Sequence, residues 1–549
     1  MLRRVGIDGN IAEKNRRDID GTGAQVRIAD AGFPVPFAHS LEFNAPVHGT
    51  WNIVHIGMLV PECHQIYVCA DNCMRGVVLT AAEMDAADRF SSVLIEEDDL
   101  YDENLETITI EGVTDAINRL PYRPRAVALF LVCLHHFVGT DAAYVFRTLE
   151  DRFPHIDFMR CWMDPVMQKT GLTPEQKLKE AMFRPVRPLP ADPRLICVLG
   201  DNQPLDPDSD LAALAREHGC RILQLHAGNL AYKGTRSADS TDSLSGRSRN
   251  GESLSRAEDI PTEVIQAEDM PAEKMTDTVF GCKTYDDYLQ IGAASLFITR
   301  SPAGIHGVTQ LAKRLGRPFL YLPPASGAEE ILEERRQLEE ALRQIRQGAS
   351  NTESFHDAPE KGSGVLKTDK FESGTSGSNA FENAVNTSAA FEEGKQRAET
   401  ALAHAYALIG DTEITLDHIV TPRPLSLARL LLEHGFHVTR VYLDAILPEE
   451  EKDFRWLQDH HPDLCLSATI HPKMRVLHEA ENAGSMLALG PKAAWFGGTA
   501  HFVNLVECGG QWGLSGIEKL AGLMEDAFLH EKDTRALVPR KGFGCACVL

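Results

Sequence analysis

The chain has 549 residues, 43% of them hydrophobic and 24% charged, which is enough for about three domains with ordinary globular cores. Its net charge of −24 argues against a surface that binds nucleic-acid phosphates or an anionic membrane, so we expect neither a nucleic acid nor a membrane as partner. No apolar stretch approaches the ~18–20 residues of a membrane span, and no secretory pattern opens the chain. We therefore expect a cytoplasmic protein whose thiols stay reduced unless they ligate metal.

Residues 1–50 show little periodicity, and we expect them to form an irregular arm over the first domain. A first αβ lobe is expected over 51–190. Its apolar run Ala126–Val132 predicts a buried strand, and Thr140 or Asp141 can cap the helix that follows. The other elements expected in this lobe are a helix over 142–153, a strand over 155–162 and a helix that opens at Thr173-Pro174-Glu175-Gln176.

A second αβ lobe is expected over 191–347, with a disordered polar insertion at about 233–275. A low-complexity linker over 348–392 leads to a third αβ lobe with a cysteine-containing tail over 393–549. Strands and helices alternate in both lobes, with the clearest expected at 194–200, 209–218, 221–226, 295–300, 307–315, 318–322, 329–347, 413–420, 425–435, 437–443, 449–460, 464–470 and 516–528. This alternation predicts an α/β fold of three Rossmann-like lobes with parallel sheets, whose ligands bind beyond the carboxyl ends of the strands.

Four of the 12 cysteines carry the strongest chemical pattern, namely Cys63, Cys69, Cys73 and Cys133. Three fall within one short segment that we interpret as a loop, and the fourth ends the apolar run Ala126–Val132. Grouped thiolates in a reduced compartment usually hold metal, and four of them match one [4Fe–4S] cluster. Structural zinc is the weaker alternative, because it prefers cysteine pairs two to four residues apart and only the gap from Cys69 to Cys73 fits.

Three segments resemble the nitrogenase component 1 family. The segment Cys133-x5-Gly139-x-Asp141, between a strand and a helix, looks like the third P-cluster cysteine motif of that family. The stretch from His55 to Cys63 looks like its earlier cysteine loop, and 512–516 resembles its turn into the last lobe helix. The resemblance covers about residues 50–540 without the two polar segments. It implies a nitrogenase component 1-like fold, shared with the dark-operative protochlorophyllide reductases and the reductase of F430 synthesis.

The resemblance also implies a function. Members of the family are iron–sulfur oxidoreductase subunits that accept low-potential electrons from a separate P-loop ATPase, the iron protein, and pair as homodimers or heterodimers with a related subunit. The chain has no Gly-x4-Gly-Lys-Ser/Thr loop of its own, which agrees with such a partner. No cysteine precedes Cys63, which favours a four-iron over an eight-iron cluster, and Asp71 or His64 could replace one thiolate. The substrate stays open.

A second metallocluster is held in nitrogenase by one cysteine of the second lobe and one histidine of the third. The nearest counterparts in position are Cys282 and His501, and Cys508 is a rival ligand because the glycines after it would let backbone approach a cluster. His135 and His136 stand beside Cys133, where imidazoles could relay protons to a substrate, as His501 could, or hydrogen-bond cluster sulfurs. Ordinary packing is an equal interpretation of the histidine pair.

Two other functions stay open at this stage. One is a non-catalytic scaffold or carrier that assembles a metallocluster for another enzyme. The other is a cluster-free αβ protein that binds a small ligand between its lobes. The C-terminal Cys545 and Cys547 stand in the wrong register for prenylation and read as a flexible tail or as extra thiols.

Overall fold

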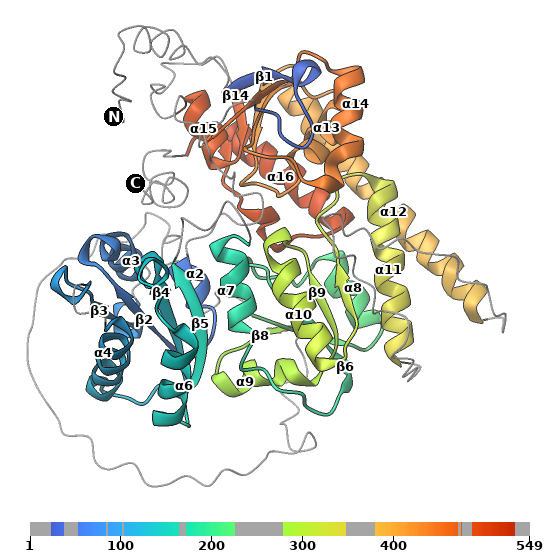
Figure 1. Ribbon diagram of the computed structural model, residues 1–549. Helices are drawn as coiled ribbons and strands as arrows, with labels where there is room; N and C mark the ends of the chain where they lie inside the picture. Colours follow the sequence, from blue (N-terminus) through green and yellow to red (C-terminus); the bar gives the residue numbers. More distant parts are fainter. Residues whose placement is uncertain are drawn as a thin grey trace, which may run out of the picture.

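The structure, a computed structural model, describes residues 24–37, 53–83, 86–100, 104–163, 172–225, 278–346, 379–469, 474 and 486–532. Three sheets flanked by helices form three lobes, coloured blue to teal, green to yellow, and orange to red in Figure 1. The expected insertion at 233–275, most of the expected linker and the two tail cysteines lie outside the described residues. No helix in the described ranges combines the length and apolar content that a bilayer crossing requires.

The first lobe is built on a four-stranded sheet of order β3-β2-β4-β5, in which every neighbouring pair is parallel. Its strands are β2 (Cys63–Cys69), β3 (Phe90–Leu94), β4 (Ala126–Val132) and β5 (Asp157–Met163). Its α-helices are α2 (Ile53–Gly57), α3 (Asp71–Glu83), α4 (Leu105–Arg119), α5 (Cys133–Phe137) and α6 (Ala142–Arg152). Asp141 caps α6, since its carboxylate accepts the Tyr144 backbone N–H at 2.9 Å. The expectation of a loop over the first three cysteines is wrong, because 63–69 is a fully buried strand.

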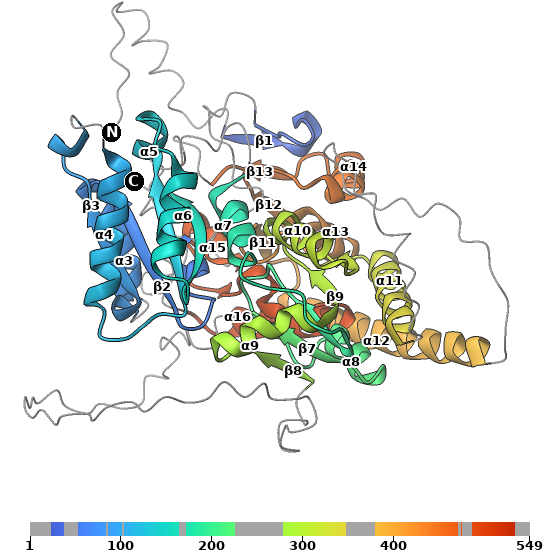
Figure 2. The same cartoon turned by 60° about the horizontal axis from the view of Figure 1, so that its bottom comes forward.

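The second lobe contains a parallel sheet of order β10-β9-β6-β7-β8. Its strands are β6 (Asp192–Val198), β7 (Arg221–Gln224), β8 (Val279–Gly281), β9 (Ala294–Thr299) and β10 (Phe319–Tyr321). The helices are α7 (Pro174–Met182), α8 (Asp210–Glu217), α9 (Tyr285–Leu289), α10 (Ile305–Leu315) and α11 (Ala328–Arg346). Helix α7 lies between β5 of the first lobe and α10, as Figures 1 and 2 show, and so connects the two lobes.

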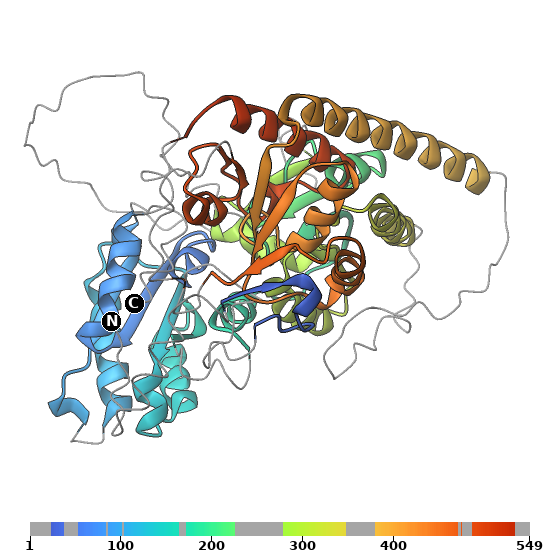
Figure 3. The same cartoon turned by 90° about the horizontal axis from the view of Figure 1, so that it is seen from above.

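The third lobe has a sheet of order β1-β13-β12-β11-β14-β15. Its strands are β1 (Gln25–Arg27), β11 (Glu413–Asp417), β12 (Val438–Tyr442), β13 (Cys465–Ser467), β14 (Met486–Leu489) and β15 (Phe502–Val503). Its α-helices are α12 (Asn379–Ile409), α13 (Pro424–Glu433), α14 (Glu451–His460), α15 (Pro491–Gly497) and α16 (Leu514–Leu529). Strand β1 pairs antiparallel with β13, so the described part of the N-terminal arm joins the third lobe and not the first. Helix α12, the long helix in Figure 3, begins inside the stretch expected to be a linker.

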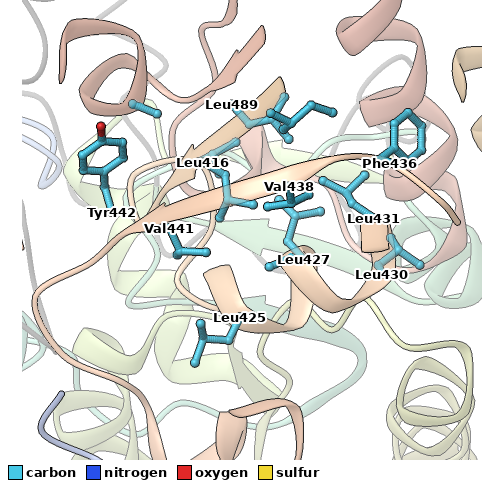
Figure 4. Packing of buried hydrophobic residues seen from close by; sticks show 14 of the residues in the cluster. Leu416, Leu425, Leu427, Leu430, Leu431, Phe436, Val438, Val441, Tyr442 and Leu489 are labelled. Carbon is cyan, nitrogen blue, oxygen red and sulfur yellow. The ribbon is translucent and has the colours of Figure 1, made fainter. Parts of the chain in front are cut away.

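The apolar cores explain how the lobes are joined. Side chains on one face of the β2–β4 sheet and on one face of the β6–β9 sheet belong to a single cluster, so the first and second lobes share a continuous core. The third lobe has a core of its own, in which Leu416, Val438 and Val441 of neighbouring strands pack against leucines of α13 (Figure 4). Each buried leucine contributes roughly 1.5–3 kcal/mol, so these cores hold the strand ends in fixed positions.

Candidate functional site

Three of the predicted cysteines lie at one edge of the first-lobe sheet, which we call the cysteine edge (Cys69, Cys73 and Cys133). Cys69 is the last residue of β2, and Cys133 directly follows the neighbouring parallel strand β4. Cys73 lies in the first turn of α3, one turn beyond Cys69. The two strands are held in register by the stacked rings of Tyr67 and Phe130, whose centroids lie 4.2 Å apart. The fold therefore brings three thiols to the carboxyl edge, where sites form in parallel sheets.

The fourth predicted ligand, Cys63, lies elsewhere. It begins β2 while Cys69 ends it, and six residues of strand at about 3.3 Å each separate the two by roughly 20 Å. Cys63 is 1% exposed, so it is not available to a second subunit either. His64 does not replace a thiolate ligand, because both of its ring nitrogens have hydrogen-bond partners. Its Nδ1 lies 2.7 Å from the Tyr122 hydroxyl, and its Nε2 lies 2.8 Å from Ser91 Oγ. Asp71, the first residue of α3, stays beside Cys69.

The electrostatics of the cysteine edge favour neutral thiols when no metal is bound. Burial raises the pKa of Cys69 to about 12, and Cys73 and Asp71 add to the rise. Burial also raises the pKa of Cys73, and the neighbouring Cys133 thiol raises it further. Iron would therefore have to displace protons as it binds. Within the described ranges, no group of three or more His, Cys, Asp or Glu side chains is arranged to hold a metal ion, so Cys69, Cys73 and Cys133 share an edge without forming a closed ligand set.

The two histidines beside Cys133 differ in burial and in their contacts. His135 is 1% exposed, with Nδ1 3.2 Å from the Val132 backbone nitrogen and Nε2 3.2 Å from Thr109 Oγ1. Burial lowers its pKa to about 4, so it is a neutral ring that fixes the start of α5. His136 is exposed and stacks on Trp162 with centroids 4.1 Å apart. Of the two, His136 is the solvent-exposed ring near the cysteine edge.

The three candidate ligands of a second metal centre lie in three different places. Cys282 follows the edge strand β8 and is 7% exposed in the core shared by the first two lobes. His501 precedes β15 at the amino end of the third-lobe sheet, with Nδ1 3.0 Å from the Ala527 carbonyl. Cys508 follows β15 at the opposite edge, in a turn with φ +57°. Burial raises the pKa of the Cys508 thiol to about 11. The structure does not bring these residues together.

A buried polar network joins α7 to the second and third lobes, and sequence reasoning missed it. Lys179 Nζ lies 2.7 Å from Glu175 Oε1 and donates to the Gly200 carbonyl, also at 2.7 Å. Asn202 Nδ2 donates to Glu175 Oε1 at 2.9 Å and to Glu507 Oε1 at 3.3 Å. Burial raises the pKa of Glu507 to about 7, while the Lys179 cation opposes the rise. The sequence feature that could have indicated this network is Asn202, which follows β6 at the carboxyl edge of the sheet, where ligands are expected to bind.

Comparisons with known proteins place the fold. No family model and no curated protein matches the chain at a significant level. Among solved structures, the chain is similar to "Nitrogenase Cp1 at pH 6.5", with 12% identity, 89% of this chain and 93% of that chain covered, and a TM-score of 0.53. A second structure, "Nitrogenase Cp1 at pH 5", covers 94% of this chain and 95% of its own, with 9% identity and a TM-score of 0.48. The first similarity shows the fold alone, and it confirms the predicted α/β class with three nitrogenase-like lobes.

Proposed function

We propose that the chain is an iron–sulfur oxidoreductase subunit of the nitrogenase component 1 type. The observation that supports the proposal is the cysteine edge, where the carboxyl ends of two adjacent parallel strands and the first turn of α3 bring Cys69, Cys73 and Cys133 to the same edge of the sheet. Three thiolates fit three of the four ligand positions of a [4Fe–4S] cluster. Asp71, or a ligand from a second subunit, would complete the set.

The residues of the edge suit a redox role in several ways. A bound cluster would supply a one-electron centre whose low potential follows from sulfur ligation and burial. Cys69 would hold the buried side, since it is 0% exposed, while exposed Cys73 and half-buried Cys133 would face an approaching partner. His136 would supply protons from the surface side. The electron donor in this proposal is a separate P-loop iron protein, as in the family that the sequence resembles, and the sequence carries no phosphate-binding loop of its own.

The test is iron binding under anaerobic conditions. After reconstitution with iron and sulfide, the wild-type chain should be brown, hold about four irons and give an electron paramagnetic resonance signal when reduced. Cys73→Ala and Cys133→Ala should lose most of this iron. Cys63→Ala is the matched control, because Cys63 lies at the other end of β2 and its loss should leave the iron content unchanged.

Two results would contradict the proposal. A wild-type chain that stays free of iron after reconstitution would remove the redox role. Equal iron loss in the Cys63→Ala variant, with far-ultraviolet circular dichroism showing an intact fold, would mean that the cysteine edge is not the binding site. Purified iron protein should then be added with ATP and reductant, and reoxidation of the cluster by a substrate would identify an enzyme.

A second candidate function is a non-catalytic scaffold or carrier for metallocluster assembly. It is favoured by the positions of Cys282, His501 and Cys508, which lie at different places in the second and third lobes. A scaffold should pass its reconstituted cluster to an apo-acceptor protein and show no reductase turnover. An enzyme should retain its cluster through repeated turnover, so the two measurements separate the candidates.

A further inference from the structure

Helix α4 carries a polar side chain on the face that it packs against the first-lobe sheet. Its residues Leu105, Thr109, Val113 and Ile117 repeat every four positions and are all buried. This spacing places them on one face of the helix, and three of the four are apolar, as packing against a sheet requires. Thr109 is 0% exposed, so its hydroxyl needs a hydrogen-bond partner inside the protein.

The partner of Thr109 is His135, which comes shortly after Cys133. His135 Nε2 lies 3.2 Å from Thr109 Oγ1, while its Nδ1 lies 3.2 Å from the Val132 backbone nitrogen and 3.3 Å from the Val132 carbonyl oxygen. Either neutral tautomer of the ring can therefore hydrogen-bond to both residues. Because Val132 directly precedes Cys133, these contacts connect α4 to the point where the chain leaves β4.

Helix α4 also binds the other end of the segment that contains Cys133. It lies beside α6 in the first lobe (Figure 1). Glu106 Oε1 accepts the Asp141 backbone N–H at 2.7 Å, and Asp141 in turn caps α6. Glu106 and Thr109 are three positions apart, so they are neighbours on the surface of α4. The segment 133–141 is therefore attached to α4 both at its start and at its end.

Of the three thiols at the cysteine edge, that of Cys133 depends most on such attachments. Cys69 ends a fully buried strand, and Cys73 belongs to the 13-residue helix α3. Cys133 begins α5, which has only 5 residues, and a helix this short is not stable by itself. Side chains that hold a metal ligand from behind typically change metal affinity by about 10–100-fold, because they fix the direction of the ligand atom.

We propose that Thr109 and Glu106 are positioning residues that set the direction of the Cys133 thiol from α4, with Thr109 acting through His135. This role rests on the proposed function, in which Cys133 is a ligand of the cluster. The contacts of α4 do not depend on iron, so they can be tested before a cluster is bound. Loss of the Thr109 contact should loosen the start of α5 and make the half-buried Cys133 more accessible.

Alkylation of the iron-free full chain tests the role of Thr109. Iodoacetamide is added to the folded protein, and mass spectrometry gives the ratio of the Cys133 rate to the Cys73 rate. Thr109→Val removes the hydroxyl but keeps the shape, and it should raise this ratio roughly threefold or more through local opening, whereas Thr109→Ser should keep the wild-type ratio. Thr107→Val is the matched control, because Thr107 is an exposed residue of the same helix.

The reconstituted protein gives a second measurement. A chelator should remove iron about tenfold faster from Thr109→Val than from wild type, and the electron paramagnetic resonance signal should change shape in this variant but not in Thr109→Ser. Glu106→Ala should raise the alkylation ratio and the rate of iron loss, whereas Glu106→Gln keeps an acceptor oxygen and should behave as wild type. A wild-type chain that binds no iron would remove the proposed function, while the alkylation result would still decide whether α4 holds Cys133.

Several results would overturn the role of α4. An unchanged alkylation ratio in Thr109→Val would show that its hydroxyl does not hold Cys133. Equal acceleration at Cys133 and Cys73, with a lower thermal midpoint, would show a general loss of stability. The same rise in Thr107→Val, or in Thr109→Ser, would show that the hydroxyl contact is not the cause. A raised ratio combined with wild-type rates of iron loss would refute the connection to the cluster.

Discussion

Glu450 offers the sharpest test of how the third lobe is held together. The residue is fully buried just before α14, and its Oε1 accepts the backbone N–H groups of Leu425 at 2.7 Å and Ser426 at 3.2 Å. Its Oε2 has no hydrogen-bond partner among the described residues. Burial raises the pKa of Glu450 from 4.5 to about 8, although the Arg423 cation opposes the rise. We expect Glu450→Gln to remove a pH dependence from the stability of the protein.

The direction of the pH dependence follows from proton binding to Glu450. Between pH 4.5 and about 8 the folded protein keeps a proton on Glu450 that the unfolded chain has released, so stability falls as the pH rises through this window. Each pH unit contributes at most about 1.4 kcal/mol, so the step from pH 5.5 to 7.5 costs wild type about 2–3 kcal/mol through this residue. Glutamine keeps the Oε1 acceptor and cannot ionise. The variant should therefore gain that amount relative to wild type over the same step.

Guanidinium denaturation followed by circular dichroism at pH 5.5, 6.5 and 7.5 measures the difference in the free energy of unfolding. Glu451→Gln is the matched control, because Glu451 is the next residue and its side chain is 57% exposed. Its curve should stay parallel to that of wild type. If the Glu450→Gln curve is also parallel to wild type across these pH values, then Glu450 is ionised in the folded protein and the reasoning fails.

Two further substitutions test other parts of the packing. Arg423→Met removes a 1%-exposed cation that pairs with both oxygens of the partly exposed Glu330 at 2.8 Å and lies 3.5 Å from the largely buried Asp453. Because Asp453 would lose this partner, the substitution should cost about 3 kcal/mol in chemical denaturation, and a cost below about 1 kcal/mol would contradict this reasoning. Gly510→Ala would place a Cβ 1.7 Å from the Pro204 carbonyl oxygen at φ +81°, so the thermal midpoint should fall by several degrees. Gly522→Ala, a control in α16 with no atom near its Cβ position, should raise the midpoint slightly, and an equal fall in both variants would refute the close approach.

Local patterns predicted much of the fold. The apolar run Ala126–Val132 became β4 with the same bounds, because a strand buried on both faces reads as a continuous apolar stretch. Asp141 was one of two expected caps, and its short side chain reaches the free N–H group of Tyr144. Thr173 and Gln176 form the capping box that opens α7, as the sequence Thr-Pro-Glu-Gln indicated. Such features depend only on near neighbours along the chain.

Features that depend on distant partners were not predicted. Strand β2 contains Cys63, His64 and Gln65, which are polar or small and read as a loop until parallel neighbours bury them. The pairing of β1 with β13 joins residues more than 400 positions apart, and no local pattern encodes it. The start of α12 at Asn379 lies in a stretch whose Ser, Gly and Asn content favours loops.

In the candidate site too, local patterns predicted some features and missed others. The sequence around Cys133 predicted that this residue lies where a strand ends, and the structure places Cys69 and Cys73 at the same edge of the sheet. Nearness in sequence suggested that Cys63 would join them. An extended strand turned that short separation along the chain into roughly 20 Å between Cys63 and Cys69, because each residue advances about 3.3 Å.

The position of β1 has a consequence for biosynthesis. Residues Gln25–Arg27 leave the ribosome early, yet their partners Cys465–Ser467 are made more than 400 residues later. At about 5–20 residues per second, the nascent N-terminal segment waits roughly 20–90 s with its hydrogen-bonding edge unmatched. The third-lobe sheet is therefore completed only after Cys465–Ser467 have been translated.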